Sequence, residues 1–479
     1  MKKILFAASE GNPFIKTGGL ADVVGALPKY LDKKIFDVRV ILPNYLCIPE
    51  PLKHTMVYVT ECYADMPRGQ EYIGVYEATA DGIRYYFLDN RHYFAGDSPY
   101  HQIYEDVNKF AFFSRAVLAI LPKLGFAPDV LHCHDWQAAL IPVFLKEFYQ
   151  NDSFYQRTKT VLTIHNQKFQ GRWKIDDIEN CKDLPAGCRY GAMEAYKESN
   201  FLKAGILYAD RVTTVSETYA AEIQQQAGGE GLDGVMRQVS GKLAGIVNGI
   251  DYEVYNPRTD PYLASHYSVK SIARKKQNKK NLQKELGLTV DPSAMVIGIV
   301  SRLTEQKGFD LVNYIMEEML QTLPVQVAIL GTGEPRYQES FLYFAGKYPG
   351  QISALITYSE ESAHKIYAGA DAFLMPSQFE PCGLSQLISM RYGTIPIVRE
   401  TGGLKDTVEA YNEIWHTGTG FSFANYDAVE MLSIIRYAHT VYQDTPEEWK
   451  NMIKRCMDAD HSWQNSAAKY EALYLDLIN

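Results

Sequence analysis

Apolar residues in the first half of the chain form short, nearly continuous runs, separated by longer stretches in which they recur at helical spacing. The longest helical stretches are residues 107–124 and 138–148. Strands that are buried on both faces have such continuous runs, so we expect a parallel sheet with helices on both sides. The alternation at residues 57–88 predicts hairpin strands and an antiparallel insertion. The runs that predict strands are residues 4–8, 38–43, 130–134, 160–165, 211–215 and 243–247.

The same alternation begins again after a polar stretch at residues 252–292, with expected strands at 296–300, 325–330, 372–376 and 394–398. We therefore predict an α/β protein with two doubly wound, Rossmann-like domains facing a central cleft. We expect the N-terminal domain at residues 1–255 and the C-terminal domain at 256–455. Residues 456–479 carry an amphipathic helix that we expect to pack back on the N-terminal domain. Ligands of such sheets bind beyond the carboxyl ends of the strands.

Charge and cysteine content limit the partners. The 479 residues carry a net charge of −9 with a pI of about 5.7, which argues against nucleic acid as a partner. Seven cysteines without a C-x-x-C pattern favour reduced thiols in a cytoplasmic protein. No apolar run approaches the ~20 residues of a membrane span. The basic run at residues 274–280 predicts a solvated helix face, with contact to a phosphate or a polysaccharide as the alternative.

Two glycine pairs lie at similar positions in the two halves. Lys16-Thr17-Gly18-Gly19-Leu20-Ala21-Asp22 and Thr401-Gly402-Gly403-Leu404-Lys405-Asp406 each follow an apolar run and precede residues at helical spacing. Glycines at a helix start let the backbone approach a ligand, and the free N–H groups there attract anions. Two unrelated turns are the alternative to a shared site for a phosphate-bearing ligand.

Polar side chains follow several of the predicted strands. Asp135, His165 and Asn248 do so in the first half, where they could bind a hydroxylated ligand or simply cap turns. Arg302 and Lys307 follow the strand at 296–300 and could neutralise a diphosphate. In a water-poor crevice a carboxylate such as Glu380 could hold sugar hydroxyls and stabilise positive charge at C1.

Other motifs do not predict a metal or a dinucleotide site. Gly229-Glu230-Gly231-Leu232-Asp233-Gly234 follows a helix-like segment, whereas the dinucleotide fingerprint follows a strand. His132-Cys133-His134 lacks a second ligand cluster, and Asp458-Ala459-Asp460 lies late in the chain and away from a strand end. A structural or substrate-facing role is the better interpretation of both histidines.

The ordered set of motifs resembles the bacterial glycogen synthase and plant starch synthase family over nearly the whole chain. Besides the two glycine motifs, the resemblance rests on His134-Asp135-Trp136, Asn200-Phe201-Leu202-Lys203-Ala204-Gly205, Val247-Asn248-Gly249-Ile250-Asp251, Ser301-Arg302-Leu303-Thr304-Glu305-Gln306-Lys307-Gly308 and Glu380-Pro381-Cys382-Gly383-Leu384.

The resemblance implies a retaining glycosyltransferase of the GT-B type that moves glucose from ADP-glucose to the non-reducing end of an α-1,4-glucan. It implies no metal and no cofactor. The implied catalytic residues are Glu380, Lys16, Arg302, Lys307, His165 and Asp135. The implied donor-binding residues are Gly18, Gly19, Asp22, Asn248, Tyr358, Cys382, Gly383, Leu384, Thr401, Gly402 and Gly403. Among these, His165 is expected to contact the glucose 6-hydroxyl and Tyr358 to pack on the base.

Three alternatives stay open. The donor could be UDP-glucose, or the chain could be another retaining transferase of the same fold. A non-catalytic glucan-binding protein is the third, although the retained Lys16, Arg302 and Glu380 speak against it. Residues 171–199 depart most from the family pattern, which leaves the acceptor preference open.

Overall fold

A computed structural model describes all residues 1–479, and the chain divides into two compact units. Unit 1 contains Met1–Asn248 and Trp463–Asn479, and unit 2 contains Gly249–Ser462. Each unit has its own large hydrophobic core. The boundaries predicted from sequence, 255/256 and 455/456, both lie within unit 2. The chain enters and leaves unit 2 side by side, because the Ile250 N–H donates to the His461 carbonyl at 2.9 Å. Because residues 250 and 461 are far apart in sequence, no local sequence pattern marks these boundaries.

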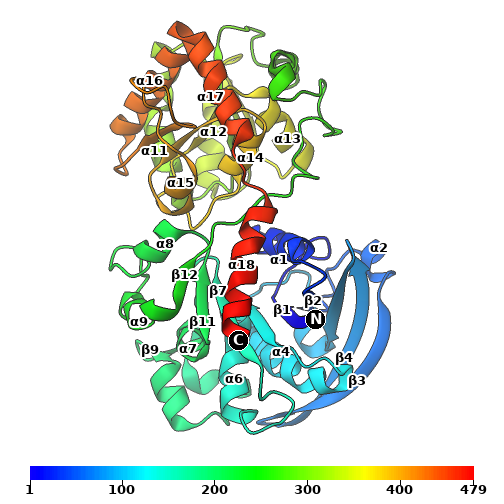
Figure 1. Cartoon of the computed structure of the whole chain (residues 1–479). Helices are drawn as coiled ribbons and strands as arrows, with labels where there is room; N and C mark the ends of the chain where they lie inside the picture. Colours follow the sequence, from blue (N-terminus) through cyan, green and yellow to red (C-terminus); the bar gives the residue numbers. More distant parts are fainter. The chain divides into compact units, whose positions relative to one another are not determined.

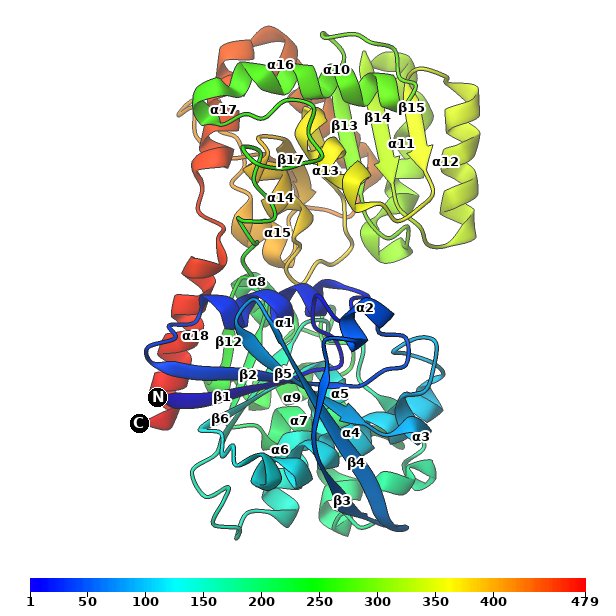
Figure 2. The same cartoon turned by 90° about the vertical axis from the view of Figure 1, so that its right-hand side faces the viewer.

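Unit 1 is built on one nine-stranded sheet (Figures 1 and 2). Neighbouring strands are parallel except at the end of the sheet, where β4 pairs antiparallel with both β3 and β5. The expected antiparallel hairpin is therefore present, but it extends the main sheet and is not a separate insertion. The spatial order is β12 (Leu243–Gly245), β11 (Arg211–Thr214), β7 (Lys159–Ile164), β6 (Val130–His134), β1 (Lys2–Ala7), β2 (Phe36–Pro43), β5 (Ile83–Asp89), β4 (Gly69–Ala80) and β3 (Val57–Met66).

The helices of unit 1 cover this sheet through their apolar faces. The helix expected at 138–148 is α6 (Leu140–Phe148), and the short helix α5 (Asp135–Ala138) precedes it. Residues 171–200 form short 3-10 and π turns and a three-stranded sheet of β8 (Arg172–Trp173), β10 (Glu198–Asn200) and β9 (Glu194–Ala195). The main helices are α1 (Gly19–Tyr30), α2 (Glu50–Lys53), α3 (Arg91–Phe94), α4 (Ile103–Leu124), α5 (Asp135–Ala138), α6 (Leu140–Phe148), α7 (Phe201–Tyr208), α8 (Glu217–Glu222), α9 (Asp233–Gln238) and α18 (Trp463–Ile478).

The C-terminal helix α18 is part of the core of unit 1. It packs beside α1 (Figure 1), and its Trp463, Tyr470 and Tyr474 are buried there. The Tyr474 hydroxyl lies 2.7 Å from Nδ1 of His132 on β6. The last helix of the chain therefore reaches the strand that precedes Asp135.

Unit 2 is built on a six-stranded parallel sheet with helices on both faces. The strands lie in the order β15 (Ile352–Leu355), β14 (Val325–Leu330), β13 (Met295–Val300), β16 (Ala372–Met375), β17 (Ile395–Arg399) and β18 (Phe421–Phe423). The helices are α10 (Lys275–Glu285), α11 (Phe309–Thr322), α12 (Pro335–Lys347), α13 (Glu360–Gly369), α14 (Ser385–Arg391), α15 (Gly402–Thr407), α16 (Ala428–Asp444) and α17 (Pro446–Asp458).

The basic run at 274–280 is not the uniformly solvated face that its composition predicts. It begins α10, which packs against α13 (Figure 2), and Lys275 and Lys279 on this face are buried. The Lys275 ammonium donates to the Ala368 carbonyl and to the Thr394 hydroxyl, both at 2.7 Å. Lys279 pairs with Asp371 at 2.7 Å. Burial is possible because each ammonium finds acceptors, which a composition count does not reveal.

Candidate active site

In unit 1 the predicted residues lie beyond the carboxyl ends of parallel strands. Asp135 follows β6, His165 follows β7 and Asn248 follows β12. The structure brings the first two together, because the His165 backbone N–H donates to Asp135 Oδ1 at 2.7 Å. Asn248 is 5% exposed and its buried Oδ1 accepts no hydrogen bond. An unpaired buried acceptor costs free energy unless a ligand supplies a donor.

Asp135 has an unusual environment for a carboxylate. It lies at a positive φ of 55°, a backbone conformation that Asp tolerates better than most residues. Burial raises its pKa to about 7, against the opposing effect of N–H donors from His165 and Asn166, and the charge of Glu10 adds to the increase. The carboxyl group is therefore poised to change its charge near neutral pH.

Three histidines form a row behind this edge, with His132 and His134 buried and His165 partly buried. The rings of His132 and His134 have centroids 4.2 Å apart, and those of His134 and His165 5.3 Å apart. Burial lowers the pKa of His132 and of His165 to about 3 and that of His134 well below its ordinary value. All three are neutral at physiological pH. His134 was interpreted from sequence as structural or substrate-facing, and its contact with His165 was not foreseen.

The glycine motif of unit 1 precedes α1. Gly18 is extended, at φ −163° and ψ −168°, and the N–H groups of Gly18 and Gly19 donate to no group of the chain. Lys16 forms an ion pair with Asp22 at 2.6 Å, and both side chains are about one-third exposed. Asp22, predicted to bind the donor, therefore holds Lys16.

Glu10 is a residue of this corner that the motif analysis missed. It is 3% exposed and accepts hydrogen bonds from the Thr17 N–H at 2.5 Å and the Thr17 hydroxyl at 2.8 Å. Tyr100 donates to the same carboxylate at 2.6 Å. Glu10 thus fixes the loop that carries Lys16 and Gly18. Its place shortly after β1, at a strand's carboxyl end, was the available signal.

In unit 2 the structure brings Lys307 and Glu380 together. The Lys307 ammonium donates to Glu380 Oε2 at 2.6 Å, and the Ser377 hydroxyl donates to the same oxygen at 2.9 Å. Oε1 of Glu380 makes no hydrogen bond within the chain, although the residue is only 6% exposed. These residues line a small cavity of about 50 Å³ at the ends of β13 and β16.

Arg302, which follows β13, contrasts with this pair. Its side chain is exposed and its guanidinium makes no hydrogen bond or ion pair. A free guanidinium at the carboxyl edge of a parallel sheet can bind a phosphate through two parallel hydrogen bonds. The structure thus leaves one cation of the edge neutralised and one available.

The second glycine motif differs from the first. The N–H of Gly403 is not free, as the helix-start argument assumed, because it donates to the carbonyls of Glu380 and Pro381 at 3.1 and 3.2 Å. A Cβ at Gly402 would lie 2.0 Å from the Glu380 carbonyl oxygen, and one at Gly403 2.0 Å from that of Cys382. The Thr401 N–H donates to Arg399. These glycines therefore let the segment that carries Glu380 pack tightly against the turn.

The other predicted donor-binding residues of unit 2 lie near the same edge. Tyr358 follows β15 and is 77% exposed. Gly383 has a φ of 73°, which glycine adopts easily, and Leu384 precedes α14. Cys382, two residues after Glu380, is buried.

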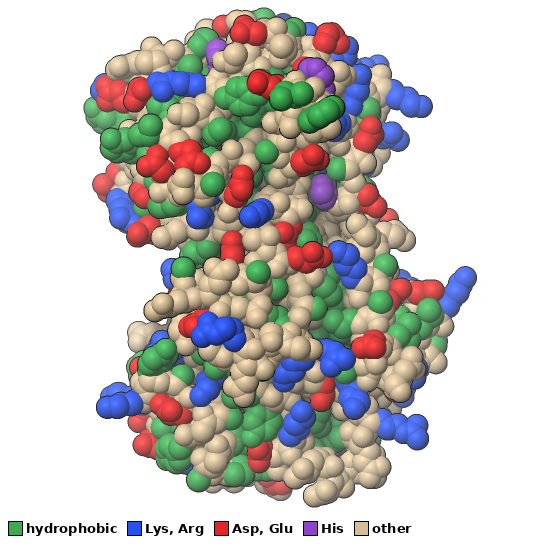
Figure 3. Space-filling view, turned by 60° about the vertical axis from the view of Figure 1, so that its left-hand side comes forward, with side chains coloured by type: hydrophobic (Ala, Val, Ile, Leu, Met, Phe, Trp, Pro, Cys, Tyr) green, Lys and Arg blue, Asp and Glu red, His purple; other side chains and the backbone are tan.

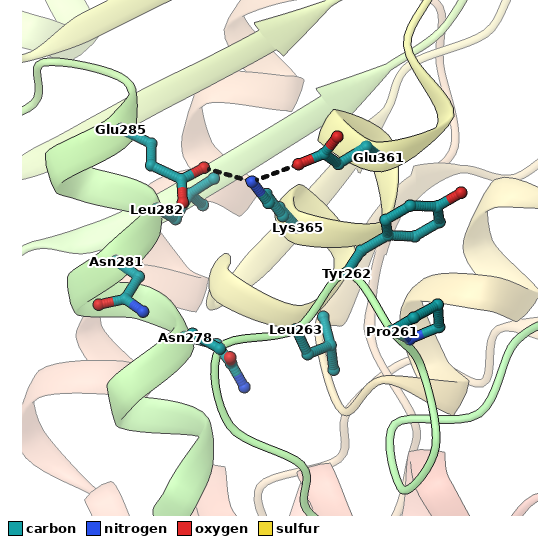
Figure 4. Close-up of a pocket in the computed structure, with 10 residues that line it drawn as sticks. Pro261, Tyr262, Leu263, Asn278, Asn281, Leu282, Glu285, Glu361 and Lys365 are labelled. Carbon is teal, nitrogen blue, oxygen red and sulfur yellow. Dashed lines mark hydrogen bonds and ion pairs between the residues drawn. The ribbon is translucent and has the colours of Figure 1, made fainter.

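The larger described cavity of unit 2 lies elsewhere, with a volume of about 280 Å³. In Figure 4 Lys365 of α13 lies between Glu285 of α10 and Glu361, with 2.8 Å to each carboxylate. Tyr262 and Leu263 form another wall. No predicted site residue lines this cavity, so size alone does not locate the candidate chemistry.

Neither the distribution of surface charge nor the arrangement of possible metal ligands points to a further site. Side chains of both signs are interspersed over the face drawn in Figure 3. No group of three or more His, Cys, Asp or Glu side chains is arranged to hold a metal ion. No helix has both the length and the apolar character that a membrane span needs.

Comparisons with known proteins identify the family. Residues 3–238 match the family model described as the starch synthase catalytic domain, and residues 279–455 match glycosyl transferases group 1. The chain is 56% identical to a glycogen synthase of Lachnospira eligens over 100% of both chains. It is 48% identical to a glycogen synthase of Anoxybacillus flavithermus, covering 99% of this chain and 98% of the relative.

A solved structure agrees with these matches. The catalytic domain of starch synthase IV from Arabidopsis thaliana, bound to ADP and acarbose, is similar with a TM-score of 0.91 and 31% identity, over 100% of this chain and 99% of that one. The predicted pair of Rossmann-like domains of the GT-B type is thereby confirmed. The resemblance inferred from the motifs is also confirmed, and the chain belongs to the glycogen synthase and starch synthase family of glycosyltransferases.

Proposed function

We propose that the chain transfers glucose from ADP-glucose to the non-reducing 4-hydroxyl of an α-1,4-glucan, with retention of configuration. The observation that carries the proposal is the edge of unit 2, where the Lys307–Glu380 pair at 2.6 Å lies beyond the same sheet as the free guanidinium of Arg302. Cations suit a departing diphosphate, and the unpaired Oε1 of Glu380 suits a sugar hydroxyl.

The roles assigned to unit 1 complement these. Lys16 and the free N–H groups of Gly18 and Gly19 act on the diphosphate, while His165, Asp135 and Asn248 bind glucose hydroxyls. We assign the acceptor side to unit 1 and the nucleotide sugar mainly to unit 2, where Tyr358 offers an exposed ring for the base. Thr401 and Gly402 are assigned to the distal phosphate.

The reaction breaks the bond between C1 of glucose and the phosphate oxygen and forms a bond from C1 to O4 of the glucan. The acceptor attacks from the face that the diphosphate leaves, and its proton passes to a phosphate oxygen. Arg302 and Lys307 stabilise the charge that builds up on the diphosphate. Glu380 orients the sugar and stabilises positive charge at C1. No side chain has to act as a covalent nucleophile in this scheme.

ADP-glucose is preferred as the donor because the similar plant enzyme was solved with ADP, while UDP-glucose remains the alternative. We propose a cytoplasmic location, which the seven free thiols support. The test is to incubate the protein with radiolabelled ADP-glucose or UDP-glucose, glycogen and EDTA. We expect incorporation from ADP-glucose that EDTA does not abolish. Faster transfer from UDP-glucose would reassign the donor, and no transfer from either would overturn the proposal.

A further inference from the structure

His134 has an incomplete set of hydrogen bonds. It is fully buried at the end of β6, and its Nδ1 lies 3.0 Å from Nε2 of His165. Its other ring nitrogen, Nε2, is buried and has no partner. Phe6 stacks on one side at 5.4 Å and 20°, and His132 packs against it at 4.2 Å and 32°. The position of the single proton on this ring therefore has consequences for its neighbour.

His132 cannot complete the set. Its Nδ1 is engaged by the Tyr474 hydroxyl at 2.7 Å and its Nε2 by the Thr163 hydroxyl at 2.6 Å. Nor does His134 carry a second proton, because burial lowers its pKa well below the ordinary value and the two neighbouring histidines add to this. A neutral imidazole has one N–H donor and one acceptor nitrogen.

Two arrangements are then possible for the His134–His165 contact. If Nε2 of His134 carried the proton, a buried N–H would have no acceptor, and such orphaned donors are rare in proteins. If Nδ1 carries it, that N–H donates to Nε2 of His165, and only the lone pair on Nε2 of His134 is left without a partner. The second arrangement makes Nε2 of His165 an acceptor, so the His165 proton must lie on Nδ1.

We propose that His134 is a positioning residue that fixes His165 in the Nδ1–H tautomer, so that His165 presents a hydrogen-bond donor to the sugar. This deepens the proposed function and rests on its assignment of His165 to the glucose 6-hydroxyl. His165 is only partly buried, and its backbone N–H is already held by Asp135 at 2.7 Å. The substrate oxygen O6 then accepts from Nδ1–H. A sugar without that oxygen gains nothing from the arrangement.

The tautomer can be measured on the full-length protein without substrate, by ¹⁵N NMR of the imidazole nitrogens with ¹⁵N-histidine labelling. The spectrum of His165→Gln assigns the His165 signals. We expect a protonated Nδ1 and an unprotonated Nε2 in the wild type. A His165 protonated on Nε2 would overturn the proposal, and this result does not depend on whether the protein transfers glucose.

Kinetics supply the second arm, with a matched pair of variants. His134→Asn can place its amide NH₂ where Nδ1–H lies, whereas His134→Leu has similar size and no donor. We expect His134→Leu to lower kcat/KM for ADP-glucose by about tenfold, the usual order for a lost buried hydrogen bond, and His134→Asn to stay within about threefold. With ADP-6-deoxyglucose the two variants should be equal to the wild type.

If both variants lost the same kcat/KM with ADP-glucose, His134 would only support packing. The same conclusion would follow if His134→Leu lost as much kcat/KM with the 6-deoxy donor as with ADP-glucose. The effect of His134→Leu should also vanish in a His165→Ala background, and persistence there would overturn the proposal. If the wild type transferred glucose from no donor, the proposed function would fail, while the NMR result would still decide the tautomer.

Discussion

The two sheet edges solve different recognition problems. The edge of unit 1 is rich in groups that are neutral at physiological pH: three histidines with lowered pKa values and a buried, unpaired amide oxygen on Asn248. At the edge of unit 2 the groups carry charge, with Lys307 on Glu380 and Arg302 exposed. Neutral donors and acceptors suit the hydroxyls of a sugar, whereas cations suit a diphosphate. The difference teaches that the carboxyl edges of two parallel sheets can offer a ligand different chemistry, set by the few side chains that follow the strands.

The largest effect should follow from removing the charge of Glu380. Glu380→Gln leaves the Lys307 ammonium without its carboxylate in a buried place, and we expect kcat to fall by about 10²–10³-fold, the order found for groups that stabilise developing charge. Ser377→Ala is the matched control, because it removes a neutral donor to the same oxygen. It should cost less than about tenfold. Steady-state kinetics measures the effect. A kcat of Glu380→Gln within threefold of the wild-type value would show that the charge of Glu380 does not contribute to turnover.

Arg302 tests the second cation of unit 2. We expect Arg302→Ala to lower kcat/KM for the nucleotide sugar by about tenfold to a hundredfold, which matches the ~1.5–3 kcal/mol of a hydrogen bond to a charged group. Stability should not change, because the guanidinium has no partner in the chain. Arg336→Ala is the control, since this exposed arginine pairs with Glu305 and Glu334. Equal kinetic losses in both variants would point to a general effect of surface charge.

The pKa of Asp135 sharpens the unit 1 side of the comparison. The native carboxyl group has a pKa of about 7, well above the ordinary 3.8, so the native state binds more protons than the unfolded state between these values. This group's contribution to stability is therefore greatest below pH ~4 and is lost as the pH rises to about 7. Asp135→Asn should remove the dependence and stabilise the protein at pH 8 by up to a few kcal/mol, at ~1.4 kcal/mol per pKa unit. Urea unfolding of the wild type and the variant at pH 5 and 8 measures this difference in stability. An equal change in the free energy of unfolding at both pH values would contradict the raised pKa of Asp135.

Lys275 gives a pH dependence of stability with the opposite slope. Burial lowers its pKa from 10.5 to about 7, so the unfolded state binds more protons between these values and stability rises with pH through that range. Lys275→Met should flatten this rise. The substitution also removes the cost of burying an ammonium. This gain in stability is offset by about 1 kcal/mol, because the Ala368 carbonyl and the Thr394 hydroxyl lose a donor. Unfolding at pH 7 and 10 checks this, and a slope unchanged by the substitution would exclude Lys275 as its source.

The local patterns carried most of the architecture. Continuous apolar runs predicted the central strands of both sheets, because a strand buried on both faces has no polar alternation. The positions of Asp135, His165, Arg302 and Glu380 after strands followed from the rule that ligands meet the carboxyl edges of parallel sheets.

The sequence could not predict which side chains and backbone groups contact one another. Nothing local shows that the Gly403 N–H is used by Glu380, or that the Glu10 carboxylate holds Thr17. The burial of Lys275 depends on acceptors supplied by another helix and another strand. The proton position on His134 depends on a missing partner, which only the packed structure reveals.

The place of α18 in unit 1 has a consequence for biosynthesis. Unit 2 is inserted between residues 248 and 463 of unit 1, and Trp463–Asn479 is therefore synthesised after all of unit 2. Unit 1 is therefore completed only after unit 2 has been translated, since Tyr474, which contacts His132, follows unit 2 in the chain. A chain that stops before α18, even with unit 2 complete, lacks the Tyr474 hydroxyl that contacts His132. It also exposes the apolar surface that α18 covers to chaperones and proteases.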